Sequence, residues 1–178
     1  MIRGKILWTS SLRIKMYSNK QILDVCCGGR MFYKDKQDSR VLFCDKRELE
    51  TTLCDGKKFV VKPDMVADFK NLPFDDESFS LVIFDPPHCL KINDKSFIVA
   101  KYGKLPLEYK LELSLGFREC WRVLKHNGTL IFKWSEVEIK IDDILSLFTE
   151  TPVIKQNTAN KSHFCVFFKT FKISEYLF

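Results

Sequence analysis

The sequence predicts an α/β fold: a mostly parallel, twisted sheet with helices on both faces and an antiparallel strand near the C-terminus. Three observations predict it. Short apolar segments that end in an acidic residue recur through the first half of the chain. A segment with the apolar spacing of a helix follows them, and strand-like apolar segments return near the end. We expect a single domain over residues 21–178, since the chain has 178 residues.

The composition is that of an ordinary globular protein, with 46% hydrophobic and 29% charged residues. The net charge of +6 moderately favours polyanionic partners. The seven cysteines are odd in number and include no C-x-x-C pair, which is typical of reduced thiols in a cytoplasmic protein. We find no signal peptide and no apolar run long enough for a membrane span. Residues 1–20 form a basic N-terminal extension, either a phosphate-contacting arm or a solvated chain end.

The first predicted strand, residues 21–25, runs into Cys26-Cys27-Gly28-Gly29. Small residues directly after a strand let the backbone approach a ligand closely. The spacing differs from the G-x-G-x-x-G pattern of nicotinamide-binding loops. The charged segment 30–40 is expected to hold a crossover with a brief helix.

Two further strands are predicted before the middle of the chain. The second, residues 41–44, ends at Asp45, a position where an acidic residue can bind ribose hydroxyls. Residues 46–64 are expected to be irregular, with a turn at Asp55-Gly56. The third strand, residues 64–67, ends at Asp68-Phe69, and a loop follows at 71–78.

The stretch Leu-Val-Ile-Phe-Asp-Pro-Pro-His, residues 81–88, is predicted to be the central strand and its tip. Its apolar run is typical of a strand buried on both faces. The two prolines end the pairing and stiffen the chain after Asp85. Because ligands of open α/β sheets bind at the carboxyl ends of the strands, this tip is either a site for a substrate amino group or a simple Pro-Pro turn.

The second half of the chain begins with a polar segment to about Leu105, which is predicted to be a substrate loop. Its candidate substrate-binding residues are Lys91, Lys95, Lys101 and Tyr102. A helix is predicted over 107–125, a strand over 129–134, a helix over 141–148 and two last strands over 152–156 and 164–171.

The order of these elements, with Asp-Pro-Pro-His and the later stretch 119–128 (Glu-Cys-Trp-Arg-Val-Leu-Lys-His-Asn-Gly), resembles the class I S-adenosylmethionine-dependent methyltransferases. The resemblance covers roughly residues 21–135 and implies their Rossmann-like fold. The tip is similar to that of amino-methyltransferases that modify adenine N6 or cytosine N4, in which an aromatic residue stacks on the target base; His88 stands at that position. The chain's small size is also similar to methyltransferases carried by phages and mobile elements.

The resemblance implies roles for individual residues. The cofactor, S-adenosyl-L-methionine, would be held by Asp24, Cys26, Gly28, Asp45, Asp68 and Phe69. The catalytic tip would be Asp85, Pro86, Pro87 and His88, with His88, Lys101 and Tyr102 contacting the substrate. The family's loop carries more glycines than this one. Asp24 has a plain structural alternative as a loop cap, and Cys26 and Cys27 have one as small packing residues.

The expected reaction is methyl transfer to an exocyclic amino nitrogen of a DNA or RNA base, and no metal is required. Hydrogen bonds to Asp85 and to the Pro86 carbonyl would favour a pyramidal, nucleophilic nitrogen, with the sulfonium aligned for attack. The alternatives are methyl transfer to a protein amide or a small molecule, and a non-catalytic cofactor-binding subunit. The chain has no separate target-recognition domain, so recognition would fall to a partner subunit or to the shape of the nucleic acid.

Overall fold

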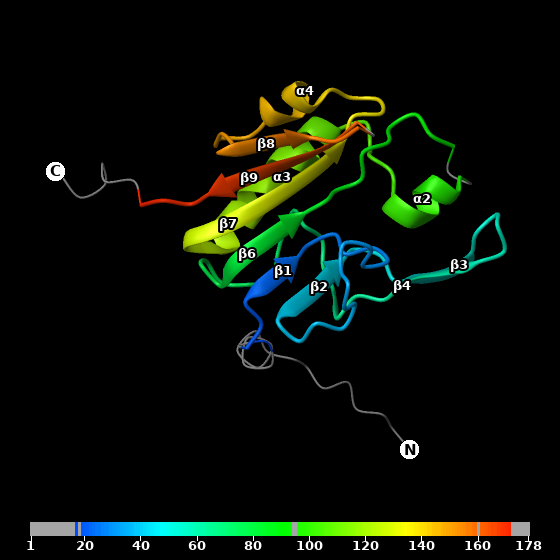
Figure 1. Cartoon of the computed structure of the whole chain (residues 1–178), viewed down its shortest axis with the longest axis horizontal. Coiled ribbons are helices and arrows are strands. Elements are labelled where there is room, and N and C mark those ends of the chain that lie inside the picture. The colour runs from blue at the N-terminus through cyan, green and yellow to red at the C-terminus, as the bar shows by residue number, and fades with distance from the viewer. Residues whose placement is uncertain (1–16, 18, 94–95, 160, 172–178) are drawn as a thin grey trace, which may run out of the picture.

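The computed structural model describes residues 17, 19–93, 96–159 and 161–171. Most of the predicted N-terminal extension lies outside them. Seven strands form one sheet in the order β5-β2-β1-β6-β7-β9-β8 (Figure 1). Their bounds are β1 (Ile22–Asp24), β2 (Val41–Asp45), β5 (Met65–Val66), β6 (Phe79–Phe84), β7 (Leu124–Ser135), β8 (Ile154–Asn157) and β9 (Ser162–Phe168). The α/β fold class predicted from the sequence is confirmed.

Strand β6 is the fourth of the seven, so the prediction of a central strand is confirmed. It pairs in parallel with β1 on one side and with β7 on the other. The side chains of Val82 and Phe84 are fully buried, as the apolar run requires. Strand β9 pairs antiparallel with both β7 and β8, which confirms the antiparallel C-terminal strand.

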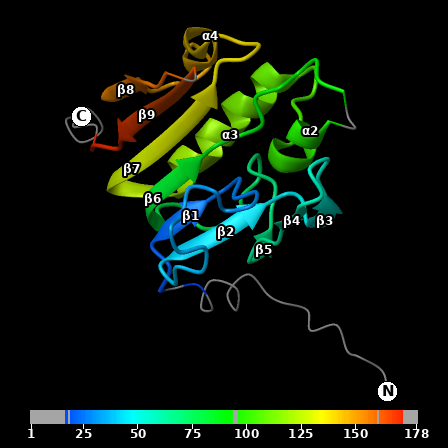
Figure 2. The same cartoon turned by 45° about the vertical axis from the view of Figure 1, so that its right-hand side comes forward.

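Helix α3 (Tyr109–Val123) covers one face of the sheet behind β6 and β7, as Figure 2 shows. Its buried side includes Phe117 and Cys120, which belong to the apolar spacing that predicted the helix, and Leu113, which does not; Leu111, the first residue of that spacing, is exposed. Close approach occurs at Gly116, where an added Cβ would lie 2.5 Å from the Phe69 ring. Helix α4 (Ile141–Leu145) joins the same core, and the following Phe148 ring stacks on Phe117 with centroids 4.1 Å apart.

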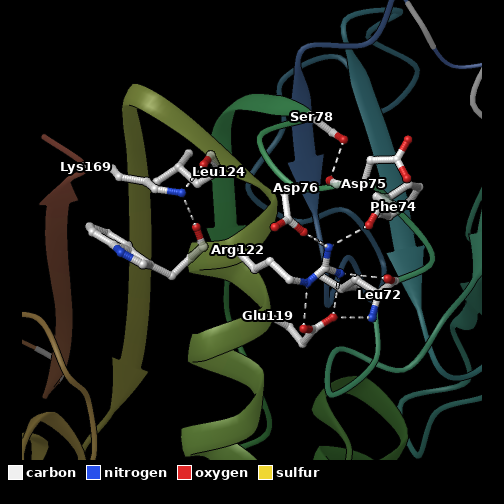
Figure 3. Close-up of polar contacts among 10 residues, drawn as sticks. Leu72, Phe74, Asp75, Asp76, Ser78, Glu119, Arg122, Leu124 and Lys169 are labelled. Carbon is white, nitrogen blue, oxygen red and sulfur yellow. Dashed lines mark hydrogen bonds and ion pairs between the residues drawn. The ribbon is translucent and has the colours of Figure 1, made fainter. Parts of the chain in front are cut away.

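Arg122 fastens the C-terminal end of α3 to the loop that leads into β6 (Figure 3). Its guanidinium donates to both carboxylate oxygens of Glu119, each at 2.8 Å. It also donates to the carbonyls of Leu72 (3.0 Å) and Phe74 (2.8 Å) and to the Asp76 carboxylate (2.8 Å). Glu119 in turn accepts from the Leu72 amide at 2.9 Å, and these bonds hold the pKa of Glu119 below its usual value. The network fixes where the central strand begins.

The connection between β1 and β2 differs from its prediction. Among the described residues, the crossover 30–40 forms turns instead of the predicted brief helix. Tyr33 from this segment packs edge-on against Phe43 of β2, with centroids 4.8 Å apart. Cys27, Val41 and Phe43 form a separate small core there. Tyr33 thus gives the charged crossover an apolar anchor on β2.

Residues 46–64 were expected to be irregular and instead contain a β-hairpin. Strand β3 (Leu49–Thr52) pairs antiparallel with β4 (Lys58–Val61), and Leu49 lies opposite Val61. The predicted turn is present, with Gly56 at a φ of +78°. The sequence does not reveal the hairpin because each strand has only four residues, too few to show a clear alternation, and β3 is mostly polar. The predicted loop after the tip contains a short helix, α2 (Phe97–Tyr102).

In the part of the chain described, the seven cysteines are free thiols, and five of them are buried. The helices described include none of the length and apolarity that crossing a membrane requires.

Candidate functional site

A cavity of about 260 Å³ lies at the carboxyl ends of β1, β2 and β6, where ligands of open α/β sheets bind. The loop after β1, helix α2 and the end of β7 complete its wall. The lining residues are Asp24, Val25, Cys26, Cys27, Gly28, Gly29, Met31, Phe32, Tyr33, Asp45, Lys46, Arg47, Phe69, Asp85, Pro87, Lys101, Tyr102 and Lys133. The fold therefore brings together residues that are more than 100 positions apart in the chain.

Asp24, the last residue of β1, is only 3% exposed. Its carboxylate accepts from the Cys26 amide at 3.1 Å and from the Tyr33 hydroxyl at 3.0 Å. Burial, with a smaller contribution from the nearby Asp85 and Asp45 carboxylates, raises its pKa to about 7. Asp24 does cap the loop, and its buried charge also creates a place where a bound cation would be stabilised.

The loop after β1 turns sharply enough for its backbone to line the cavity. Gly28 has a φ of +48°, in the left-handed region, and an added Cβ would lie 3.5 Å from the Lys101 carbonyl oxygen. Its amide donates to Asp45 at 3.0 Å, which joins the loop to the end of β2. This backbone conformation favours glycine at position 28.

Asp45 is buried at the end of β2, and both of its carboxylate oxygens have partners. Besides the Gly28 amide, it accepts from the Arg47 amide at 2.9 Å and from Arg47 Nε at 3.2 Å. The same guanidinium donates to the α2 carbonyls of Val99 and Ala100, at 3.3 and 3.2 Å. Arg47 thus ties helix α2 to the sheet beside the cavity.

Asp85 forms an ion pair with Lys133, which lies at the end of the neighbouring strand β7. The Nζ–Oδ1 distance is 3.1 Å, and the two side chains are 12% and 19% exposed. Burial raises the pKa of Asp85 to about 6, while the Lys133 ammonium opposes this effect. Lys133 Nζ also lies 5.8 Å from the ring centroids of both Phe32 and Tyr102. Asp85 is therefore a partly buried carboxylate, and with a pKa of about 6 it is mostly ionised at neutral pH.

The remaining residues of the tip are buried and only partly reach the cavity. Pro87 lines the cavity, whereas Pro86 and His88 are not among the residues that line it. The His88 ring is 7% exposed and lies between Tyr102 and Trp134, with centroids 5.5 and 6.4 Å away. Burial lowers its pKa to about 4, so the ring is neutral at pH 7. Tyr102 lines the cavity and contacts the His88 ring, which does not line it, and base stacking by His88 stays a prediction.

Of the two predicted cofactor-binding residues that follow β5, Asp68 and Phe69, one lines the cavity and the other does not. Phe69 lines the cavity and packs against Phe84 with centroids 5.4 Å apart. Asp68 does not line the cavity, and its carboxylate accepts a hydrogen bond from the Lys70 amide at 3.0 Å. Lys101 and Tyr102 reach the wall from α2, while Lys91 is outside it and Lys95 is outside the described residues.

Lys133, Arg47, Tyr33 and Phe32 are cavity residues that sequence reasoning did not single out. Arg47 follows the strand-end Asp45 by two residues, so its position beside a predicted site residue could have marked it as part of the site. Lys133 lies near the end of the predicted strand 129–134. A charged residue within this apolar run is the sequence signal that could have marked it as a site residue. Tyr33 and Phe32 stand in a segment without periodicity and gave none.

Comparison with known proteins supports the fold alone. No known family model matches the sequence, and no curated protein matches it. Solved structures do match, among them the PH0226 protein from Pyrococcus horikoshii. The superposition has a TM-score of 0.53 at 17% identity and covers 90% of this chain and 87% of that chain. The fold of the chain is therefore Rossmann-like α/β.

Proposed function

We propose that the chain is an S-adenosylmethionine-dependent methyltransferase that acts on an exocyclic amino nitrogen of a nucleic-acid base. One observation carries the proposal: three strand-end carboxylates, Asp24, Asp45 and Asp85, line a single cavity beside a glycine loop. Two of them lie at strand ends where a nucleoside-like ligand is expected, and the third begins the Asp-Pro-Pro tip.

The donor set of the cavity fits this cofactor. The amino group of the cofactor is a cation, and Asp24 is a buried carboxylate whose pKa is raised by burial, so a cation beside it would stabilise its ionised form. Phe69 offers an apolar ring for the adenine, and the Gly28 region offers backbone. Asp45 is suited to accept hydrogen bonds from the ribose hydroxyls. Because Arg47 forms an ion pair with the same carboxylate, ribose binding would replace part of that ion pair with hydrogen bonds from the hydroxyls. When bound, the cofactor supplies a methyl group already activated by a positively charged sulfur.

The chain's own contribution is to orient the acceptor nitrogen and remove its proton. Asp85 accepts a hydrogen bond from the substrate amino group, and the Pro86 carbonyl accepts the other. Because the Lys133 ammonium opposes the effect of burial, Asp85 is ionised at pH 7 and able to accept. The prolines hold the tip rigid, so little ordering is required when the acceptor binds. Lys101 and Tyr102, which line the same cavity as Asp85, would contact the substrate.

A nucleic-acid acceptor is favoured over a protein or small-molecule acceptor by charge and by the tip. The chain carries a net charge of +6, and long-range attraction of polyanions follows from such an excess. The base must leave its stack to reach a cavity of this kind, so a single-stranded or unpaired target is the natural substrate. A partner subunit can supply sequence recognition.

The proposal is tested by measuring cofactor binding and methyl transfer separately. Calorimetry should detect S-adenosylmethionine binding by the wild type and a large loss in Asp45→Ala. Asp85→Ala should keep most of the binding but lose transfer of labelled methyl to nucleic acid, since its contact with the amino group matters mainly in the transition state. Asp143→Ala, at an exposed position on α4, is the matched control.

Two results would contradict the proposal. Undetectable cofactor binding by the wild type would remove the methyltransferase assignment. Label found only in protein or in small metabolites, after incubation with DNA, RNA and protein fractions and nucleoside separation, would remove the nucleic-acid acceptor.

A further inference from the structure

A second hollow, of about 620 Å³, lies between the β3–β4 hairpin and the loop after β1. We call it the hairpin groove. Strand β4 and the turn before it form one wall, and residues 28–37 and Lys101 of α2 form the other. Figures 1 and 2 both place the hairpin next to α2, beyond the carboxyl ends of the strands. The hairpin stands in the connection between two parallel strands, where a helix is usual.

The hairpin groove is strongly basic. Among the described residues, six cationic side chains and no carboxylate line it. The six are Arg30, Lys36, Lys57, Lys58, Lys62 and Lys101. Three of them pair with carboxylates nearby: Arg30 with Asp64, Lys57 with Asp55 and Lys58 with Glu50. The two lysine pairs are well exposed, and such pairs contribute little, so a phosphate can replace the carboxylate at small cost.

An aromatic side chain lies among these charges. The Phe59 ring is half-buried and its edge lies against the β1 loop, since a Cβ added to Gly29 would come within 2.7 Å of it. A basic groove with an aromatic ring is the arrangement that binds single-stranded nucleic acid, in which cations track the backbone and bases stack on the ring.

The hairpin groove adjoins the proposed active site. Gly28, Gly29, Met31 and Lys101 line both the groove and the cavity. A chain that lies in the groove therefore passes beside the opening through which a base would reach Asp85.

We infer that the hairpin groove binds the phosphate backbone of a single-stranded nucleic acid and delivers one of its bases to the cavity. The inference rests on the proposed function, since it names the hairpin groove as the surface that binds the nucleic-acid substrate of that reaction. Lys58 and Lys62 contact phosphates, and Phe59 stacks on a base next to the target.

The test is binding of fluorescent 12-nucleotide single strands of DNA and RNA, and of the matching duplex, over a range of salt concentrations. The double variant Lys58→Ala/Lys62→Ala should bind single strands at least tenfold more weakly. Its slope of log K against log[salt] should be shallower by about 1.4, from about 0.7 for each single-strand phosphate contact. Phe59→Leu should weaken binding about tenfold without changing the slope.

The matched control is Lys110→Ala/Lys140→Ala, which removes two exposed lysines outside the groove. It should bind like the wild type. Equal weakening by the control, an unchanged salt slope in the groove variant, or duplex bound as tightly as single strands would each overturn the inference. If groove-dependent binding is found but labelled methyl enters only protein, the groove stands and the proposed acceptor is wrong.

Discussion

Replacing Asp24 by asparagine should stabilise the protein at neutral and alkaline pH. The folded chain keeps a proton on this buried carboxyl up to about pH 7, whereas the unfolded chain releases it near 3.8. Between these values the folded state binds more protons, so its stability falls as pH rises and stays low above pH 7. A difference of about 3 pH units corresponds to about 4 kcal/mol. Asparagine carries no charge and can keep both hydrogen bonds, to the Cys26 amide and to the Tyr33 oxygen.

Urea unfolding at several pH values measures this effect. The stability of Asp24→Asn relative to the wild type should grow by about 2–3 kcal/mol between pH 5 and pH 8, because about two of the three pH units lie in that range. Asp143→Asn, at an exposed site, controls for the loss of one negative charge. If the stability difference between Asp24→Asn and the wild type does not change with pH, the argument that burial raises the pKa of Asp24 in the folded state is refuted.

The same group should couple cofactor binding to proton release. An ammonium group bound beside Asp24 lowers the pKa of the carboxyl from about 7, so binding at pH 6 should expel a proton. Calorimetry in two buffers that differ in ionisation enthalpy measures the number of protons released. Asp24→Asn should bind S-adenosylmethionine far more weakly and release none. Proton-neutral binding by the wild type at pH 6 would contradict contact between Asp24 and the cofactor's amino group.

Two further variants test other parts of the structure. Lys133→Met should raise the pKa of Asp85 from about 6 by about 1–3 pH units, since it removes the cation that opposes burial. The acid limb of the pH–rate profile for methyl transfer should move to higher pH, and an unmoved limb would count against Asp85 as the acceptor. Arg122→Met should destabilise the fold by about 3 kcal/mol in urea unfolding, because it leaves Glu119 and two carbonyls without their donor. Arg118→Met, exposed on the same helix, should change stability by less than about 0.5 kcal/mol, and equal effects would contradict the network.

The elements that were predicted correctly are those with a strong local pattern. The apolar run of β6 and the apolar spacing of α3 report burial directly, because a strand or helix that packs into a core must present apolar side chains at its own period. Both elements lie close to where the sequence placed them. The hairpin was missed because β3 and β4 are stabilised by pairing with each other, and neither strand alone carries an alternating pattern.

The amino-acid sequence by itself determined the strands of the seven-stranded sheet, the main helix and the strand-end acids Asp24, Asp45 and Asp85, since strand ends are local features and their carboxyl ends meet at one edge of a parallel sheet. Only the tertiary structure decided how these acids are partnered. Lys133 meets Asp85 across 48 positions because β7 pairs with β6, and the His88 ring packs among Tyr102 and Trp134 because α2 folds back over the tip. Such contacts depend on the register of strands and on the path of a loop. Both are set by the packing of the whole chain, and neither is written in the residues beside the site.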